Sequence, residues 1–288
     1  MSFGSPFTVG VVVAVVVAAC ASSSPVVSSP ADPITPKPLA IGETFRLMSR
    51  VLGEQRVINV YLPPGYAEST ERSIVLYMPD GGIKEDFPHV TGIVDVSIKN
   101  QLIRPVIVVG IENTERRRDL PGPTDVPEER KAAPHAGGSD RFRQFLRDEL
   151  KPYIAMHYRV ADKSAIIGES LAGLFVVETL LTEPALFDWY IAADPSVWWN
   201  NRALVRSAAQ RFAAWSAAPK TLFIATADYK DTLDAIDVLL DAHRTHKPKD
   251  LMIQYEPMPS EHHNTIYPHA ALAGIRALFA SEPSPPVR

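Results

Sequence analysis

The sequence predicts an α/β domain with a doubly wound, mostly parallel sheet, an antiparallel hairpin at its N-terminal edge and helices on both faces. Two observations carry this prediction: short runs that are apolar throughout recur along the chain, and amphipathic helical segments lie between them. Apolar runs without alternation are typical of central strands in a parallel sheet, because both faces of such strands are covered. A chain of 288 residues with 46% hydrophobic composition is long enough to bury the core of one such domain.

The first two strands are expected at residues 44–49 and 56–62, on either side of a turn at Gly53-Glu54. A hairpin followed by repeated strand–helix units predicts the doubly wound sheet. In the helical segment 139–158, apolar side chains fall on one stripe, and Ser139 or Asp140 can cap its start. The other apolar runs lie at 73–78, 106–111, 165–167, 190–193, 221–225 and 251–255, and the other helical patterns at 171–181, 231–243 and 266–279.

The two ends of the chain are expected to lie outside this domain. Residues 11–19 contain only valine and alanine, a run too short to span a bilayer but typical of a signal-peptide core. The run ends Val17-Ala18-Ala19-Cys20, which resembles a bacterial lipobox and predicts lipidation of Cys20. The predicted organisation is a lipoprotein-type signal peptide at 1–19, a serine- and proline-rich tether at 20–39, the α/β domain at 40–280 and a disordered tail at 281–288.

Charge and cysteine content narrow the function classes. A net charge of −4 argues against nucleic acid as a partner, because binding phosphates needs a basic surface. We expect contact with the membrane only through a lipid anchor at Cys20, which places the protein in a bacterial cell envelope or outside the cell. Cys20 is the single cysteine of the sequence, so the domain can form no disulfide and has no thiol nucleophile. The basic run Arg116-Arg117-Arg118 is either a solvated loop face or an anion contact.

The segment Gly168-Glu169-Ser170-Leu171-Ala172-Gly173 indicates a reaction class, nucleophilic attack by a serine. Ser170 follows the apolar run 165–167 and precedes a predicted helix, so it lies at a tight strand-to-helix turn of the kind called a nucleophile elbow. Such a turn strains the serine backbone and requires small residues two positions on either side, which Gly168 and Ala172 supply. The free N–H groups at the helix start favour a developing anion. The alternative is an ordinary turn with a helix-capping serine.

A serine hydroxyl reacts only when a histidine takes its proton and a carboxylate orients that histidine. In an elbow enzyme of the α/β-hydrolase type the chain order is serine, acid, histidine. Asp228 follows the predicted strand 221–225 and is favoured as the acid, while Asp231 can instead cap the next helix. His262 and His263 follow the last strand, and both are candidates for the base. A metal cluster at Glu261-His262-His263 is disfavoured, because a second pair of ligands is missing.

Acyl transfer also needs two N–H donors aimed at the oxyanion. The first is expected from Leu171, directly after the nucleophile. The second is expected from the loop after the strand 73–78, where Gly81 and Gly82 allow close approach of the backbone. No cofactor or metal is required by this chemistry.

Five motifs follow one another along the chain: Tyr77-Met78-Pro79-Asp80-Gly81-Gly82, the segment 110–120, the elbow 168–173, Pro195-Ser196-Val197-Trp198-Trp199, and the segment 261–268. Together they resemble the putative esterase family of the α/β-hydrolase fold, which holds the enterochelin-type siderophore esterases. The resemblance implies His263 as the base, Gly82 with Leu171 as the oxyanion hole, and a substrate pocket bordered by Arg116, Arg117 and Trp198. Ala172 departs from the family's usual glycine.

The sequence therefore predicts a serine carboxylic-ester hydrolase that acts on a small-molecule ester through Ser170, His263 and Asp228. Acyl transfer to an envelope acceptor on the same three residues is one alternative. A binding lipoprotein that uses the fold without catalysis is the other.

Overall fold

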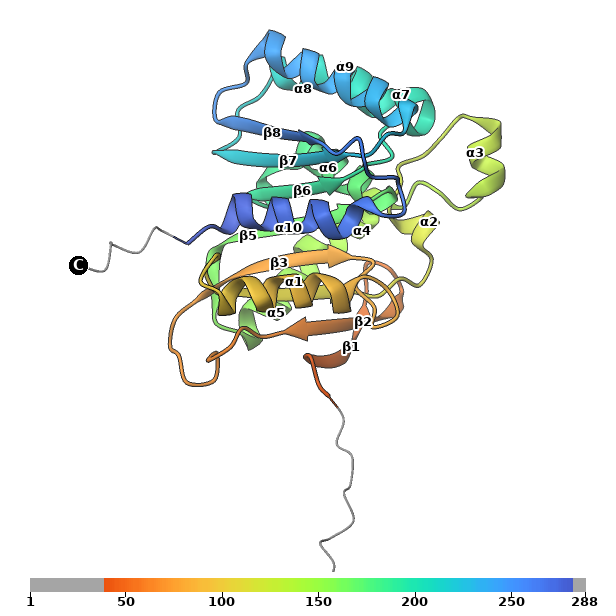
Figure 1. The fold of residues 1–288 in the computed structure, drawn as a ribbon. Coiled ribbons are helices and arrows are strands. Elements are labelled where there is room, and N and C mark those ends of the chain that lie inside the picture. Colours follow the sequence, from red (N-terminus) through yellow and green to blue (C-terminus); the bar gives the residue numbers. More distant parts are fainter. Residues whose placement is uncertain (1–38, 282–288) are drawn as a thin grey trace, which may run out of the picture. The chain divides into compact units, whose positions relative to one another are not determined.

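The computed structural model describes residues 39–281, which form one eight-stranded sheet covered by helices on both faces (Figure 1). The order of the strands across the sheet is β1-β2-β4-β3-β5-β6-β7-β8. The signal peptide, most of the tether with Cys20, and all but the first residue of the predicted tail lie outside the described residues. The strands are β1 (Glu43–Ser49), β2 (Glu54–Tyr61), β3 (Ser73–Pro79), β4 (Val106–Ile111), β5 (Val160–Glu169), β6 (Trp189–Ala193), β7 (Lys220–Thr226) and β8 (Leu251–Pro257).

The strand directions confirm the predicted mixture of one antiparallel edge and a parallel body. β1 pairs antiparallel with β2, and β2 pairs antiparallel with β4. Every pairing from β4 through β3, β5, β6 and β7 to β8 is parallel. The carboxyl ends of these six strands therefore meet at one edge of the sheet, where ligands of open α/β sheets bind.

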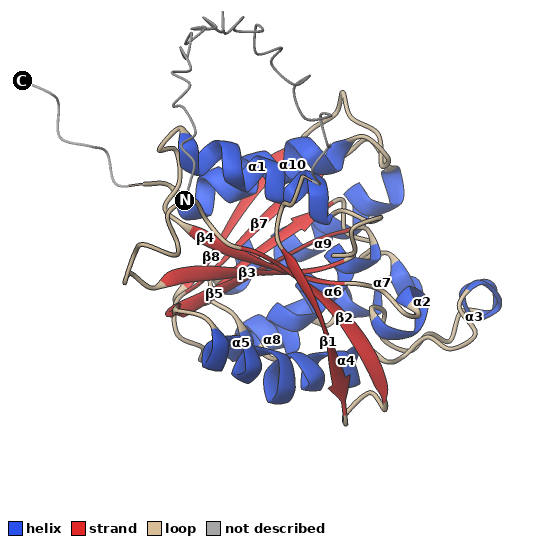
Figure 2. Cartoon of the chain, turned by 90° about the horizontal axis from the view of Figure 1, so that it is seen from below, coloured by secondary structure: helices blue, strands red, loops and turns tan. Residues whose placement is uncertain are grey.

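The helices form a layer on each face of the sheet. α1 and α10 lie on one face, whereas α4, α5, α6 and α8 lie on the other (Figure 2). The helical elements are α1 (Phe87–Lys99), α2 (Arg116–Asp119), α3 (Pro127–Ala132), α4 (Ser139–Phe145), the π-helical turn η1 (Leu146–Leu150), α5 (Lys151–His157), α6 (Leu171–Thr182), the 3₁₀ turn η2 (Pro184–Leu186), α7 (Trp199–Arg206), α8 (Ala208–Ala213), α9 (Lys230–His246) and α10 (Ile266–Phe279).

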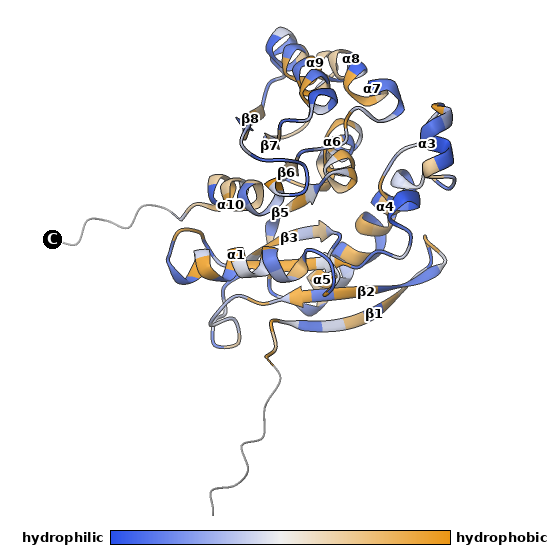
Figure 3. Ribbon diagram, turned by 45° about the vertical axis from the view of Figure 1, so that its right-hand side comes forward, coloured by the Kyte–Doolittle hydropathy of each residue, from blue (hydrophilic) through white to orange (hydrophobic). Residues whose placement is uncertain are grey.

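Two apolar clusters, one on each face, explain why the central strands are apolar throughout. Ile166 of β5 belongs to the cluster under α6, whereas its neighbours Ala165 and Ile167 belong to the cluster under α1 and α10. Successive side chains of a strand point to opposite faces, so a strand covered on both sides needs an apolar residue at every position. Figure 3 shows α6 mostly in hydrophobic colours, and ten of its residues are buried.

The predicted strands and helices are present, with differences at their ends. The segment 139–158 is not one regular helix, because Pro152 lacks an N–H group and a π-helical turn precedes it. Helix α1 was absent from the prediction, although Phe87, Val90 and Val94 form a buried stripe at helical spacing. Helix α7 was also absent from the prediction, and it is interrupted by three residues, 200–202, with left-handed backbone angles. In the part of the chain that the structure describes, none of the helices is long and apolar enough to cross a membrane.

Candidate active site

The candidate site lies at the carboxyl edge of the sheet, where several neighbouring strands end in polar residues. Asp80 follows β3, Ser170 follows β5 and Asp194 follows β6. His263 lies in the loop between β8 and α10. Because β5 and β6 are adjacent, with Glu169 paired to Ala193 in register, Ser170 and Asp194 leave the sheet side by side.

Ser170 has the strained backbone expected of an elbow. Its φ of 60° and ψ of −119° lie outside the regions that a serine ordinarily occupies. The turn is held by the Ser170 N–H, which donates to the carbonyl of Ala193 at 3.0 Å. Gly168 is required here, because an added Cβ would lie 2.6 Å from the carbonyl carbon of Ala172. The Cβ of Ala172 would lie 2.7 Å from the same added Cβ, so the turn accommodates alanine at position 172 only while position 168 is glycine.

Ser170, His263 and Asp194 form a continuous chain of hydrogen bonds. The distance between Ser170 Oγ and His263 Nε2 is 3.0 Å, and that between His263 Nδ1 and Asp194 Oδ2 is 2.5 Å. Asp194 is fully buried, whereas the side chain of His263 is 50% exposed. A buried carboxylate on Nδ1 places the proton there and leaves Nε2 free to accept the proton of the serine hydroxyl.

Asp194 is held by a second contact that fixes its carboxylate. The backbone N–H of Ala227 donates to Asp194 Oδ1 at 3.1 Å, so each carboxylate oxygen accepts one N–H group. The backbone N–H of Asp194 itself donates to the carbonyl of Ala225 at 2.8 Å. These bonds compensate for burying the charge, which would otherwise be costly.

The prediction that Asp228 orients His263 is wrong in this structure. Asp228 Oδ2 lies 3.0 Å from Nδ1 of His262, the neighbouring histidine, and both side chains are at least half exposed. Asp231 lies in the first turn of α9 and accepts a hydrogen bond from Tyr229 at 3.1 Å. The carboxylates of the loop after β7 therefore contact His262 and Tyr229 and not His263. Asp194, the aspartate after β6, is hydrogen-bonded to His263 instead.

The signal for Asp194 was present in the sequence. It follows the apolar run 190–193 directly and precedes Pro195, and this position after a strand is the argument that favoured Asp228. The sequence could not rank the two positions, because β6 and β7 are adjacent and both end at the site. Only the path of the loop that carries His263 decides which carboxylate the imidazole reaches.

That loop is anchored to the end of β7. The N–H of Met258 donates to the carbonyl of Thr226 at 2.8 Å, and the N–H of Asp228 donates to the carbonyl of Glu261 at 3.3 Å. Within the loop, Thr265 Oγ1 accepts the N–H of His262 at 3.0 Å and donates to Glu261 Oε2 at 2.7 Å. These bonds fix the backbone on both sides of His263 and so direct its ring toward Ser170.

The two predicted oxyanion donors, the N–H groups of Leu171 and Gly82, differ in whether they already have a hydrogen-bond acceptor. Leu171 is the first residue of α6, and its N–H makes no hydrogen bond to another group within residues 39–281, as expected at the start of a helix. The N–H of Gly82 instead donates to Glu85 Oε2 at 2.7 Å. Glu85 also accepts a hydrogen bond from the side chain of Asn113 at 3.0 Å. An oxyanion therefore has to replace the Glu85 carboxylate before it can use the Gly82 N–H.

Arg116 links two strand ends at the site. Its Nε and Nη2 atoms donate to the two oxygens of Asp80 at 2.7 Å each, and Nη2 also donates to the carbonyl of Glu169 at 3.3 Å. Arg117 donates to the carbonyl of Ala132 at 2.8 Å and is exposed. Arg116 therefore links the elbow to the end of β3. These hydrogen bonds use Nε and Nη2, so only part of the guanidinium group can contact a substrate.

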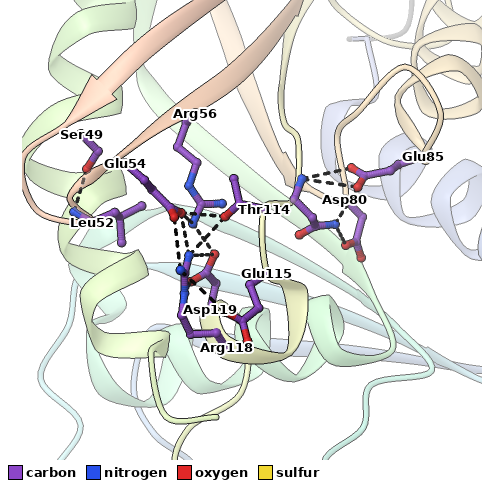
Figure 4. A network of polar contacts seen from close by, with 11 residues as sticks. Ser49, Leu52, Glu54, Arg56, Asp80, Glu85, Thr114, Glu115, Arg118 and Asp119 are labelled. Atoms are coloured by element: carbon purple, nitrogen blue, oxygen red, sulfur yellow. Dashed lines mark hydrogen bonds and ion pairs between the residues drawn. The ribbon is translucent and has the colours of Figure 1, made fainter. Parts of the chain in front are cut away.

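A buried ion-pair network fixes the segment that carries Arg116 (Figure 4). Arg56 of β2, which is 1% exposed, pairs with Asp119 of α2. Arg118 joins them, with donor distances of 2.7 Å to Asp119 and 2.6 Å to Glu54. The network ties α2 to the β1–β2 hairpin, so the edge of the sheet positions the arginine segment.

The two tryptophans of the predicted pocket border have different surroundings. Trp199 is buried, and its indole N–H donates to the carbonyl of Gly122 at 3.0 Å. Trp198 is half-buried against the same apolar cluster. Trp199 is therefore a core residue, whereas Trp198 keeps an accessible face.

Several titratable groups at the site have shifted pKa values. The hydrogen bond to Asp194 raises the pKa of His263, and the negative charges of Glu169 and Asp194 add to this effect. Burial raises the pKa of Glu169 to about 7 and that of Asp86 to about 6. Perturbed groups of this kind cluster at functional sites. Among residues 39–281 no group of three or more histidine, cysteine, aspartate or glutamate side chains is arranged to hold a metal ion.

The fold and the site together define the class of protein. A sheet with this strand order, a strained serine after the fifth strand, and a histidine on the loop after the last strand constitute the α/β-hydrolase fold. The family model described as Putative esterase matches residues 49–246, and the chain belongs to this family.

Similar proteins agree with this assignment. The ferri-bacillibactin esterase BesA of Bacillus subtilis is 38% identical over 115 residues, which are 35% of this chain and 40% of that protein. A siderophore enterobactin esterase of Emericella nidulans is 39% identical over 84 residues, 28% of this chain and 27% of that protein. The match therefore spans less than half the length of each of these relatives. An IroE-like serine hydrolase from Shewanella oneidensis superposes with a TM-score of 0.76 at 29% identity, covering 83% of this chain and 80% of that chain.

Proposed function

We propose that the protein is a serine carboxylic-ester hydrolase in which Ser170 is the nucleophile, His263 the base and Asp194 the orienting acid. The observation that carries this proposal is the chain of hydrogen bonds from Asp194 through His263 to a serine with elbow geometry. Membership of an esterase family and the relatives named as siderophore esterases support the same reaction class.

In the first half of the reaction Ser170 Oγ attacks the ester carbonyl carbon and transfers its proton to His263 Nε2. The carbonyl oxygen becomes an anion, which the N–H of Leu171 stabilises, joined by the N–H of Gly82 once the anion has displaced Glu85. The C–O bond to the alcohol then breaks, and His263 returns the proton to the leaving oxygen. The products of this half are the free alcohol and an acyl group on Ser170.

In the second half a water molecule attacks the acyl carbon while His263 Nε2 takes one of its protons. The second tetrahedral anion collapses, the bond to Ser170 Oγ breaks, and His263 protonates the serine oxygen. The carboxylic acid leaves and the enzyme regains its starting state. Asp194 stays ionised throughout and stabilises the imidazolium that forms in each half.

The proposed substrate class is small-molecule esters, and siderophore esters are the first to test because two relatives bear that name. The accessible face of Trp198 is proposed to border the pocket. Arg116 is hydrogen-bonded to Asp80, and Arg117 is hydrogen-bonded to the backbone carbonyl of Ala132. These contacts give no support to a role of either arginine in binding an anionic group of the substrate. The lipid anchor at Cys20 and the envelope location stay predictions from the sequence.

The deciding experiment is hydrolysis of a p-nitrophenyl ester, and labelling by a fluorophosphonate, with the wild-type protein and the Ser170→Ala variant. The wild type is expected to turn over the ester and to take up the label at Ser170, and the variant is expected to do neither. Ser196→Ala is the matched control for removing a nearby serine hydroxyl, because Ser196 Oγ lies 3.4 Å from Ser170 Oγ and forms no hydrogen bond with His263 within the described residues. Labelling of Ser170→Ala at the wild-type rate would disprove the assignment.

A further inference from the structure

Glu169, the residue before the proposed nucleophile, lies beside the base. Its Oε1 atom is 3.6 Å from His263 Nε2, the nitrogen that faces Ser170 Oγ at 3.0 Å. The Glu169 side chain is only 17% exposed, so its charge is poorly screened by water. The catalytic histidine therefore has a carboxylate on each ring nitrogen: Asp194 on Nδ1 and Glu169 near Nε2.

The charged groups around Glu169 come from three segments: the loop between β3 and α1, helix α2, and the loop between β8 and α10. Asp80 after β3 and Asp86 before α1 are acidic and disfavour its ionised form, whereas Arg116 of α2 and His263 favour it. Tyr267 of α10 is buried, and its hydroxyl has no hydrogen-bond partner within the described residues. Arg116 pairs directly with Asp80, and His263 has the larger favourable effect on the ionised form of Glu169.

Because Glu169 Oε1 lies 3.6 Å from His263 Nε2, the charge of each group affects the protonation of the other. Burial raises the pKa of Glu169 to about 7, and the Glu169 charge in turn raises the pKa of His263. Two groups this close release their protons in steps that belong to the pair. The ionised carboxylate favours the imidazolium, which is also the form of His263 in the transition state.

We propose that Glu169 is a positioning residue that stabilises protonated His263 during ester hydrolysis and thereby sets the pH range in which the enzyme works. The inference rests on the proposed function, since it assigns Glu169 a role in the same reaction. Glu169 acts on the imidazolium that forms when Ser170 gives up its proton, in addition to Asp194 on the opposite nitrogen.

The test is the pH dependence of kcat/KM for a neutral p-nitrophenyl ester with the wild type and the Glu169→Gln variant. Removing one charge at this distance is expected to move the acidic limb to lower pH by about 0.5–1 unit, given the half-exposed histidine. The same loss of attraction lowers the plateau by roughly 3- to 10-fold. At low pH the two profiles are expected to converge, because Glu169 of the wild type is then neutral as well.

If Glu169 has only a structural role, Glu169→Gln is expected to lower kcat/KM by the same factor at every pH and to leave the acidic limb of the profile at the wild-type position. That result would overturn the proposal. Glu169→Asp, which keeps the charge, is expected to keep the limb closer to the wild-type position. Asp228→Asn is the matched control for removing a carboxylate, because Asp228 contacts His262, and its profile is expected to coincide with the wild type.

Labelling by a fluorophosphonate separates this proposal from the proposed function. A wild type that is not labelled and has no esterase activity would refute the reaction itself. A wild type that is labelled, with a Glu169→Gln variant whose acidic limb does not move, would refute only the role of Glu169.

Discussion

Replacing Asp194 by asparagine is expected to abolish most of the activity while changing the shape of the site little. Asp194 accepts one N–H from Ala227 and one from His263, each on its own oxygen. Asparagine has a single oxygen and an NH₂ group, so it can satisfy only one of these two donors. The Ala227 donor is fixed in the backbone and takes the oxygen, which leaves the NH₂ group against His263 Nδ1.

The consequence for His263 follows from its tautomer. An NH₂ group donates to Nδ1, which then carries no proton, and the proton moves to Nε2, where it blocks acceptance of the Ser170 proton. The same exchange in a serine–histidine–aspartate site typically lowers kcat by about 10⁴-fold, which corresponds to about 5.4 kcal/mol of transition-state stabilisation. We expect a loss of this order in kcat/KM for Asp194→Asn.

The assay compares Asp194→Asn with Asp228→Asn on a p-nitrophenyl ester, with the thermal midpoint of each variant measured to confirm folding. Asp228 is half exposed and, within the described residues, is hydrogen-bonded to His262 and not to His263, so its variant is expected to stay within about threefold of the wild type. A large loss in Asp228→Asn together with full activity in Asp194→Asn would refute the reading of the site.

Two further predictions concern the elbow and the base. Gly168→Ala places a Cβ 2.6 Å from the Ala172 carbonyl carbon and is expected to lower the free energy of unfolding by about 1–3 kcal/mol and to impair ester hydrolysis, as measured by denaturant unfolding and kinetics. Gly92→Ala is its control, because a Cβ there meets nothing within 4 Å in helix α1, and we expect a gain of about 0.5–1 kcal/mol. For the wild type, the raised pKa of His263 means that the neutral base is lost as the pH falls through a value above 6.5, the ordinary value for histidine. A kcat/KM profile whose acidic limb lies below pH 6.5 would contradict this reasoning.

Local sequence patterns were sufficient for the sheet and for the nucleophile. Apolar runs located six of the eight strands to within a few residues at most ends, because a strand covered on both faces admits only apolar side chains. The other two strands, β1 and β2, were located by the turn at Gly53-Glu54. The nucleophile elbow could also be predicted from the sequence, because the sharp turn at Ser170 requires small residues on both sides of it. Both are constraints that act within a few residues along the chain.

The acid, the second oxyanion donor and the partner of the base depended on contacts between distant segments. Asp194 and Asp228 occupy equivalent positions after adjacent strands, and the path of the loop 258–265 chooses between them. The engagement of the Gly82 N–H by Glu85 follows from the fold of the loop after β3. The sequence by itself thus determined the fold class and the serine, because short-range backbone and burial requirements specify them, whereas His263 was chosen over His262 through the family resemblance. Tertiary structure alone decided which carboxylates face His263, because that depends on a few ångströms between loops that meet only when the sheet is assembled.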